Sequence, residues 1–321
     1  MAEDNFGQER QRPQEAWERS LLERLAYETL SEQRKARHWG IFKFFFALFM
    51  LLVFFVILLV PFGEQRLSGQ YTALVDLNGI IAPGSPASAD YVITGLRAAF
   101  ESKAKGVILR TNSPGGSPVQ SSYINDEIVR LRAKYPDMPL YAVIGDVCAS
   151  GCYYTVASAD KIFANQASLV GSIGVLMDGF GFVDAMKKLG IERRLLTAGK
   201  DKGILDPFSP LTPQHKRHTQ KMLNDIHQQF IDTVREGRGD SLKETRETFS
   251  GLFWTGDKAL DMGLVDELGS ASYVAREVIG AEQIVDFTYR ENVFDRFAGR
   301  LGSSIAHTLG TNYLGLTPGV K

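Results

Sequence analysis

The sequence predicts an α/β domain with parallel strands and crossover helices, preceded by one transmembrane helix. One run of the chain is apolar for the length of a membrane span, and the short apolar segments after it alternate with helical segments. Near-continuous apolar strands separated by helices are typical of a parallel sheet whose two faces are covered. Only two of the 321 residues are cysteine, which excludes a fold built on several disulfides.

The composition excludes two further classes of protein. Lys and Arg together number 36 and Asp and Glu number 37, for a formal net charge of −1. A nucleic-acid-binding domain needs a clustered excess of basic residues, so we expect no nucleic-acid partner. Apolar residues make up 44% of the chain and charged residues 23%, which is typical of a folded protein and not of a disordered one.

The apolar run lies between Phe44 and Val60, and with its flanks it extends from Ile41 to Phe62. At 1.5 Å per residue the longer stretch spans about 33 Å, enough to cross a ~30 Å hydrocarbon core. A cleaved signal peptide is the alternative. It has only a short basic stretch before its apolar run, whereas about 40 residues precede this one, and no A-x-A-like site follows it. We therefore predict a retained helix in contact with membrane lipid at residues 41–62.

The charges that flank this helix predict its orientation. Arg34, Lys35, Arg37 and Lys43 lie before or at its start, whereas Glu64 and Arg66 roughly cancel after it. The positive-inside rule places the N-terminus in the cytoplasm and everything beyond Phe62 on the other side of the membrane.

The rest of the chain divides into four segments. Residues 1–40 form an N-terminal cytoplasmic segment, in which Pro13–Arg37 has the apolar spacing of an amphipathic helix. That helix either lies on the inner leaflet, binds a partner or is a solvated stub. Residues 63–70 are a linker and residues 71–290 the folded domain. Residues 291–321 are an amphipathic extension that could pack on a neighbour or touch the membrane.

Within the domain, strands and helices are predicted in alternation. The predicted strands are Tyr71–Leu77, Gly106–Arg110, Leu140–Ile144 and Lys161–Ala164, and the predicted helices are Tyr91–Lys103, Gln120–Ala133, Ser150–Ala159 and Pro213–Glu236. The last helix begins with Pro213 at its first position behind Thr212 as N-cap, a typical helix start.

The sequence lacks the motifs that are typical of several other kinds of chemistry. The chain has no phosphate-binding loop and no dinucleotide fingerprint, so we expect no cofactor and no nucleotide-driven work. His215 and His218 could share a helix face and bind metal, but a solvated polar face is the stronger interpretation, and we expect no metal site. The G-x-S-x-G elbow of α/β-hydrolases is also absent.

Two glycine-containing turns suggest acyl-transfer chemistry. Ser113–Gly116 (SPGG) follows a predicted strand, and adjacent glycines let backbone N–H groups point at a ligand, as an oxyanion hole requires. Ser150 lies at a strand-to-helix junction, where it is either an N-cap or a nucleophile near the positive end of a helix dipole. A serine nucleophile needs a base, and a desolvated lysine could serve. The segment Thr197–Gly203 offers Lys200 and Lys202, and local sequence does not choose between them.

In combination, five ordered motifs resemble the signal peptide peptidase A family. They are Ser113–Gly116, Ala149–Tyr154, Val170–Val175, Gly199–Lys202 and Trp254–Asp266. The match covers roughly residues 71–280 and is similar to the short, single-repeat form with an N-terminal anchor. A related membrane peptidase, SohB, shares several of these motifs and is the nearest competitor.

The resemblance implies a Clp protease/crotonase-like fold and a Ser-Lys dyad. Ser150 matches the family's nucleophile, Lys202 its general base and Ser172 a serine that orients the lysine amine. Gly116 and Gly151 match the oxyanion donors. It also implies a ring-shaped homo-oligomer in which serine and lysine meet across subunit boundaries. The implied substrates are signal-peptide-like, and the implied location is the bacterial inner membrane with the catalytic domain in the periplasm.

One position departs from the family pattern, which usually has two glycines after the nucleophile. Here the second is Cys152, which would be strained if its backbone required a positive φ. Cys148 and Cys152 flank Ser150 and would face an oxidising compartment. A disulfide is conceivable there, but we expect two buried, unpaired cysteines that act as small hydrophobic residues.

The sequence thus predicts a membrane-anchored, ATP-independent serine endopeptidase. A SohB-like peptidase with other substrates is one alternative, and two others belong to different functional classes. The first is a catalytically silent membrane scaffold of the same fold, since fold alone does not settle function. The second is a crotonase-like acyl-CoA enzyme, which the external placement of the domain and the presence of both Ser150 and Lys202 disfavour.

Overall fold

The computed structural model describes residues 34–35, 37–56 and 70–290. The chain divides into two compact units, Met1–Leu67 and Ser68–Lys321. The predicted amphipathic helix at Pro13–Arg37 lies almost wholly outside the described residues, as do most of the linker at 63–70 and the extension at 291–321.

The first unit contains one apolar helix, Arg37–Val56. Its most apolar 18-residue window has a mean hydropathy of 2.4, and none of that window is buried inside the structure. The helix is long and apolar enough to cross a membrane by length and composition. It overlaps the predicted span of 41–62, of which residues 57–62 lie outside the described part of the chain.

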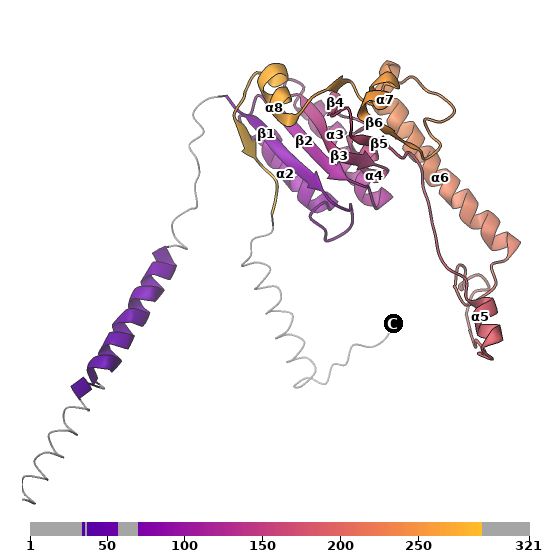
Figure 1. Cartoon of the computed structure of the whole chain (residues 1–321), viewed down its shortest axis with the longest axis horizontal. Coiled ribbons are helices and arrows are strands. Elements are labelled where there is room, and N and C mark those ends of the chain that lie inside the picture. Colours follow the sequence, from indigo (N-terminus) through magenta and orange to yellow (C-terminus); the bar gives the residue numbers. More distant parts are fainter. Residues whose placement is uncertain (1–33, 36, 57–69, 291–321) are drawn as a thin grey trace, which may run out of the picture. The chain divides into compact units, whose positions relative to one another are not determined.

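The second unit is built on a mostly parallel sheet. Its centre is formed by β1 (Thr72–Asn78), β2 (Gly106–Ser113) and β3 (Leu140–Ala149), and the strand order is β6-β5-β3-β2-β1-β8 (Figure 1). Strand β4 (Lys161–Ala164) leaves this path and pairs with β3 and β7. Only β5 and β6 are antiparallel among the described pairs. The predicted α/β class with parallel pairing is therefore confirmed.

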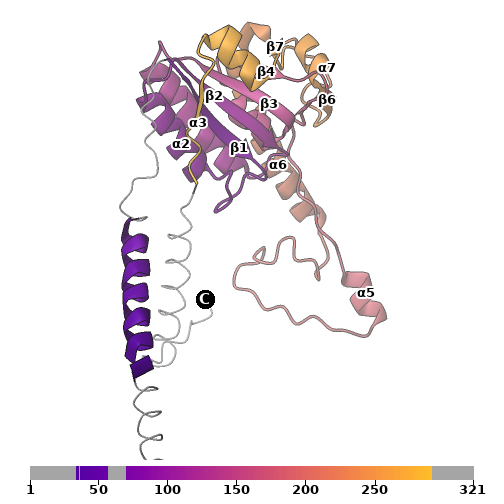
Figure 2. The ribbon, with the colours of Figure 1, turned by 60° about the vertical axis from the view of Figure 1, so that its left-hand side comes forward.

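Helices cover both faces of the sheet, as Figure 2 shows. On one face, α2 (Ala89–Glu101) packs closely on β1, where the Cα of Gly95 lies against Val75. On the other face, Leu74, Ile108 and Val143 form an apolar cluster with the segment η2 (Val274–Ile279). Two buried faces explain why the central strands read as nearly continuous apolar runs.

The remaining elements are short, apart from two helices. They are α3 (Pro118–Lys134), α4 (Gly151–Val156), β5 (Leu169–Gly171), α5 (Val183–Lys188), α6 (Pro213–Arg238), η1 (Gly239–Ser241), β6 (Phe253–Thr255), α7 (Gly256–Asp261), β7 (Glu267–Leu268), α8 (Ala271–Tyr273) and β8 (Ile284–Asp286). The helix predicted from Pro213 begins there, and the Thr212 side chain accepts a hydrogen bond of 3.1 Å from the His215 backbone N–H.

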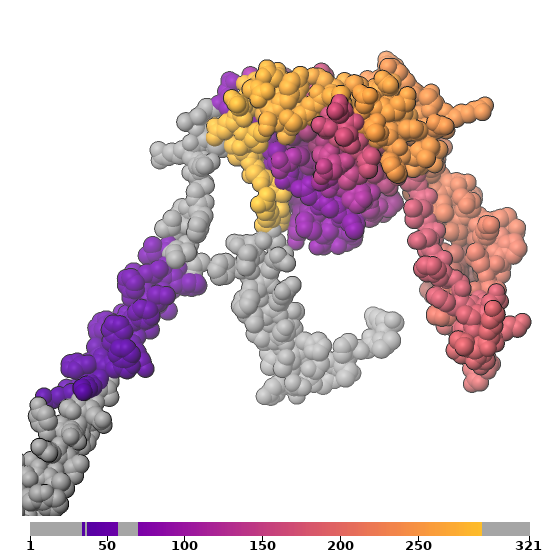
Figure 3. All heavy atoms as spheres, viewed as in Figure 1, coloured from indigo at the N-terminus to yellow at the C-terminus, as the bar shows by residue number. Residues whose placement is uncertain are grey.

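For residues 174–212, which we call the arm, the sequence analysis predicted no helix or strand. The arm carries α5, none of whose residues is buried, and it exposes several large apolar side chains; Leu176, Phe180 and Leu196 are 82%, 80% and 95% exposed. Helix α6 buries residues only near its C-terminal end, so its first two thirds extend from the core together with the arm (Figures 1 and 3). Exposed apolar patches are typical of surfaces that bind a partner.

Candidate active site

Ser150 occupies the turn between β3 and α4 in a conformation that serine rarely adopts. Its φ is 54° and its ψ −125°, in the left-handed half of the backbone map. It holds the N-cap position, yet its side chain makes no capping hydrogen bond. The hydroxyl has no hydrogen-bond partner in the described part of the chain, so the N-cap interpretation does not explain this serine.

Two hydrogen bonds hold the backbone of this turn. The Ser150 N–H donates to the carbonyl oxygen of Gly171 over 2.8 Å, and the Ser150 carbonyl accepts from the Tyr154 N–H over 3.1 Å. The first bond ties the turn to β5 and the second to the first turn of α4. A left-handed non-glycine residue persists only when its surroundings fix it in this way.

Ser172 lies beside Ser150 because their strands are in register. Ala149 of β3 pairs with Gly171 of the parallel strand β5, and each serine is the next residue of its strand. Adjacent strands are about 5 Å apart. Ser172 also has a left-handed backbone, with φ 53°, and its N–H donates to the Leu252 carbonyl over 2.7 Å. The structure therefore brings these two predicted site residues together.

The Ser113–Gly116 turn lies directly against Ser150 and Gly151. A Cβ atom on Gly115 would stand 2.7 Å from the Gly151 nitrogen and 2.9 Å from the Ser150 Cβ, so no side chain fits there. Gly115 and Gly116 have φ values of 98° and 152°, which glycine tolerates and other residues do not. This close approach unites the two predicted glycine-containing turns in one place.

Two backbone amides at this contact have no acceptor. Neither the Gly116 N–H nor the Gly151 N–H donates a hydrogen bond within residues 70–290. A Cβ on Gly151 would lie 3.2 Å from the Gly116 nitrogen, so the two amides are neighbours. The Gly151 amide also belongs to the first turn of α4, where N–H groups lack intrahelical partners. The pair can stabilise a negatively charged oxygen next to the Ser150 hydroxyl.

Sequence reasoning missed the role of Ser113. Its hydroxyl is fully buried and accepts a hydrogen bond of 3.1 Å from the Gly115 N–H, which fixes the start of the SPGG turn. A serine hydroxyl that accepts a hydrogen bond from the backbone N–H two residues later forms a known local turn. The sequence therefore contained a signal for this role of Ser113.

The prediction of two unpaired cysteines is wrong. Cys148 and Cys152 form a disulfide, with Cα atoms 5.1 Å apart. The physical reason is the tight strand-to-helix turn, which folds the end of β3 back on the first turn of α4 and brings the two Cα atoms within disulfide range. Cys152 does not have the positive φ that would strain it. The non-glycine residues with positive φ in the described chain are Ser150, Ser172 and Leu205.

Lys202 is not brought to Ser150 within one chain. It is exposed in an arm turn, and its neighbour Asp201 lies 3.0 Å from the His215 ring near the start of α6. Twelve residues further along α6, the His227 ring contacts the carbonyl oxygen of Ile173, the residue after Ser172. This stretch of helix measures about 18 Å, which is farther than a lysine side chain extends.

Two of the three histidines on α6 contact groups outside the helix. His215 contacts Asp201 and His227 contacts the Ile173 carbonyl, over 3.0 Å and 3.1 Å. No cluster of three metal-ligating side chains occurs among the residues that the structure describes.

Beneath α4, a buried polar network supports the site. The Tyr153 hydroxyl donates to the Leu264 carbonyl over 2.8 Å, and burial raises the pKa of this phenol. Nearby, the buried Arg238 guanidinium donates to Asp266 over 2.6 Å and to the Gly263 carbonyl over 3.0 Å. The Trp254–Asp266 motif thus fixes the helix that follows Ser150 without contributing to the site itself.

Comparison with known proteins identifies the family. The model of peptidase family S49 matches residues 132–284. "Putative protease slr0021" of Synechocystis is 31% identical over 198 residues, which are 62% of this chain and 69% of that protein. "Putative signal peptide peptidase SppA" of Enterococcus faecium is 28% identical over 259 residues, 77% of this chain and 75% of that protein.

A third relative is much longer than this chain. The "Na(+)/H(+) antiporter NhaA" of Brucella melitensis is 42% identical over 186 residues, which are 58% of this chain and 25% of that protein. The matched residues thus span about a quarter of the length of that relative. Its name describes the whole protein and not the quarter that is similar to this chain. The family model covers β3, the Ser150 turn and the arm, and this chain belongs to peptidase family S49, the family of the signal peptide peptidase A proteins.

Proposed function

We propose that the chain is a membrane-anchored, ATP-independent serine endopeptidase in which Ser150 is the nucleophile. One observation carries the proposal. The Ser150 hydroxyl, without a hydrogen-bond partner in the described chain, lies beside two backbone amides, of Gly116 and Gly151, that donate to no acceptor there. A nucleophile next to paired N–H donors is the arrangement that acyl transfer requires.

In the proposed reaction, the Ser150 oxygen attacks the carbonyl carbon of a peptide bond while its proton passes to the uncharged amine of Lys202. The Gly116 and Gly151 N–H groups donate to the oxygen that becomes negative. Lys202 then gives the proton to the departing amine, and the peptide bond breaks to leave an ester on Ser150. Lys202 next takes a proton from water, and the hydroxide formed attacks the ester carbonyl. Lys202 returns this proton to the Ser150 oxygen as the ester bond breaks, which releases the second product and restores both residues.

Lys202 has to come from another copy of the chain. Within one chain the arm turn that carries it lies about 18 Å along α6 from the neighbourhood of Ser172. The arm exposes large apolar side chains, which suits contact with a neighbouring subunit. A head-to-tail contact generates a ring when its rotation closes, and we propose such a ring-shaped homo-oligomer, in line with the family resemblance.

Ser172 is proposed to orient the incoming amine. Ser172 directly follows β5, and the pairing of Gly171 with Ala149 supports a position of Ser172 near the Ser150 turn, within reach of a lysine that approaches Ser150. A hydroxyl there can accept a hydrogen bond from the amine and direct its lone pair toward Ser150.

The proposed location is the inner membrane of a bacterium, with the peptidase domain outside the cytoplasm. The apolar helix Arg37–Val56 is long enough to span, and the basic residues near its start favour a cytoplasmic N-terminus. The Cys148–Cys152 disulfide supports an oxidising compartment for the domain. The proposed substrates are signal-peptide-like apolar peptides, as the name of the Enterococcus relative suggests.

The test uses the full-length protein in detergent micelles and a fluorogenic apolar peptide. Wild type and Lys200→Ala should cleave it, whereas Ser150→Ala and Lys202→Ala should each lose activity by about a thousandfold or more. Full activity of the Ser150→Ala variant would refute the proposal. A folded wild type that cleaves nothing would favour the alternative of a silent scaffold.

A further inference from the structure

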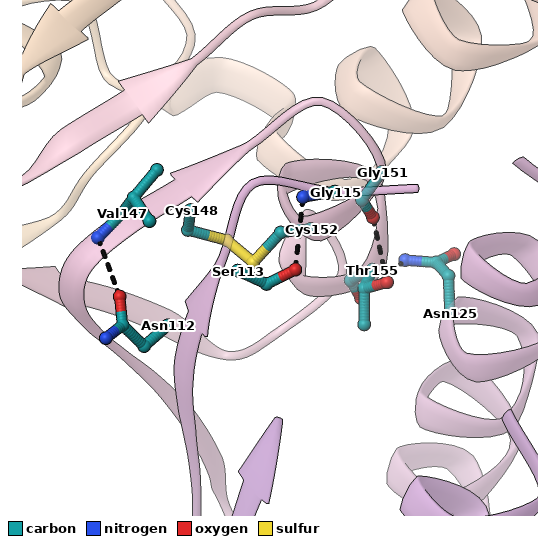
Figure 4. The surroundings of a disulfide bond; sticks show 9 residues. All are labelled: Asn112, Ser113, Gly115, Asn125, Val147, Cys148, Gly151, Cys152 and Thr155. Atoms are coloured by element: carbon teal, nitrogen blue, oxygen red, sulfur yellow. Dashed lines mark hydrogen bonds between the residues drawn. A yellow bond between two sulfur atoms is a disulfide. The ribbon is translucent and has the colours of Figure 1, made fainter. Parts of the chain in front are cut away.

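The turn that carries Ser150 is closed by a covalent bond. Cys148 is the next-to-last residue of β3, and Cys152 is the second residue of α4. Their disulfide therefore joins the end of the strand to the first turn of the helix and spans Ser150. Figure 4 shows Ser113 and Gly115, from the turn opposite, beside the two cysteines.

This turn needs a constraint because Ser150 is held in an unfavourable backbone conformation. With φ at 54°, a serine tends to relax toward negative φ unless the surroundings prevent it. The two backbone hydrogen bonds of Ser150 provide part of the constraint. The disulfide adds to it, because a covalent ring from Cys148 to Cys152 admits few alternative conformations at its middle residue.

The same bond also acts on the paired amides. Cys148 pairs with Ser113 across β2 and β3, and the Ser113 hydroxyl fixes the Gly115 N–H. On the other side, Cys152 follows Gly151 directly, and the Gly151 carbonyl accepts from the Thr155 hydroxyl over 2.9 Å. The disulfide thus links the strand that supports Gly116 to the helix turn that supplies the Gly151 amide.

Both cysteines are fully buried, at 0% exposure. A soluble reductant reaches such a bond only when the turn opens, so the bond is a permanent part of the site and not an exposed redox switch. A ring this short removes less entropy from the unfolded chain than a long ring does, so a local effect on the turn is to be measured apart from global stability.

We propose that Cys148 and Cys152 are positioning residues for catalysis. Their disulfide holds Ser150 in its left-handed conformation and so keeps its hydroxyl aligned with the Gly116 and Gly151 amides. This inference rests on the proposed function of Ser150.

The test compares full-length wild type with the Cys148→Ala/Cys152→Ala double variant in detergent micelles. Three quantities are measured: kcat and KM for an apolar peptide, the rate at which a fluorophosphonate labels Ser150, and hydrogen exchange across residues 148–156. We expect kcat and the labelling rate to fall about tenfold to a hundredfold, because small displacements of reacting groups have large effects. KM should change less than twofold, and exchange should become faster.

The matched control is a substitution of Ile279, to Val or Ala, chosen to lower Tm as much as the double variant does. Ile279 packs near Gly106, at the end of β2 opposite Ser113. It should keep the wild-type labelling rate. An unchanged labelling rate in the double variant, or an equal fall in the Ile279 variant, would overturn the inference. If wild-type Ser150 reacts with neither probe nor peptide, the proposed function is wrong, and exchange at 148–156 still decides whether the disulfide fixes the turn.

Discussion

The backbone N–H of Ser150 donates a hydrogen bond of 2.8 Å to the carbonyl oxygen of Gly171, the residue before Ser172. This bond joins the turn after β3 to the end of the parallel strand β5. It places the two left-handed serines of the site side by side, although they are 22 positions apart in the sequence. Both serines end a strand at the same edge of the sheet, which is where parallel α/β sheets typically carry their ligand sites.

Replacing Gly116 by Ala should abolish peptide cleavage. The new Cβ would collide with the carbonyl oxygen of Ile81, and relief of the clash would move the Gly116 amide. Loss of one oxyanion donor costs about a hundredfold or more in kcat. Gly84→Ala is the matched control, since Gly84 also has a positive φ (72°) but nothing lies within 4 Å of its Cβ position. Steady-state kinetics on both variants check the prediction, and equal effects would contradict it.

Ser172→Ala and Ser172→Gly should lower kcat by a similar factor, of about tenfold or more. Both variants lack the hydroxyl, but only glycine adopts the observed φ of 53° without strain. A loss confined to the Ala variant would mean that the backbone of Ser172 matters and its hydroxyl does not. Comparison of kcat for the two proteins separates these interpretations.

Native protein should contain no reactive thiol. Alkylation followed by mass spectrometry should label neither Cys148 nor Cys152 before reduction and both after reduction in denaturant. The double Ala variant should lose about 2 kcal/mol of unfolding free energy, the amount expected for so short a ring. Labelling of either cysteine in the untreated, freshly isolated protein would contradict the disulfide.

Stability should depend on pH through Glu127. Hydrogen bonds from Arg130, and then from Arg97, lower the pKa of this carboxyl from 4.5 to about 2, against the opposing effect of its burial. Because the folded pKa is the lower one, Glu127 stabilises the fold above about pH 4.5 and loses this contribution as the pH falls toward 2.

The Glu127→Gln variant should therefore be less stable than wild type at pH 7, by about 1–3 kcal/mol. The difference should shrink between pH 5 and pH 3. Chemical denaturation at several pH values measures it, and Glu236→Gln, at an exposed position of α6, is the control. A difference that stays constant from pH 7 to pH 3 would refute the assignment.

The sequence was sufficient for the parts of the fold that depend on local patterns. Apolar runs predicted β1 to β4, with β4 correct at both ends, and Thr212-Pro213 predicted the start of α6. The strands β5 to β8 have two or three residues each, too few to show a periodic pattern. They form only because the central strands present edges to pair with.

The site was predictable as a set of residues but not as a geometry. Ser150, Ser172, Gly116 and Gly151 were named from motifs, and the structure gathers them at one edge of the sheet. The pairing of Cys148 with Cys152 was missed because it depends on how sharply the chain turns after β3. The separation of Lys202 from Ser150 agrees with what the family resemblance implied, but no local pattern predicts it, because it results from the direction of α6 and the arm.

The most direct test of the central claim is activity in mixed oligomers. Ser150→Ala and Lys202→Ala subunits, each inactive alone, are co-assembled in equal amounts by joint expression and assayed on the apolar peptide. If Ser150 of one chain works with Lys202 of the next, random mixing should restore about a quarter of wild-type activity. Mixed oligomers that remain as inactive as either parent would contradict the shared site.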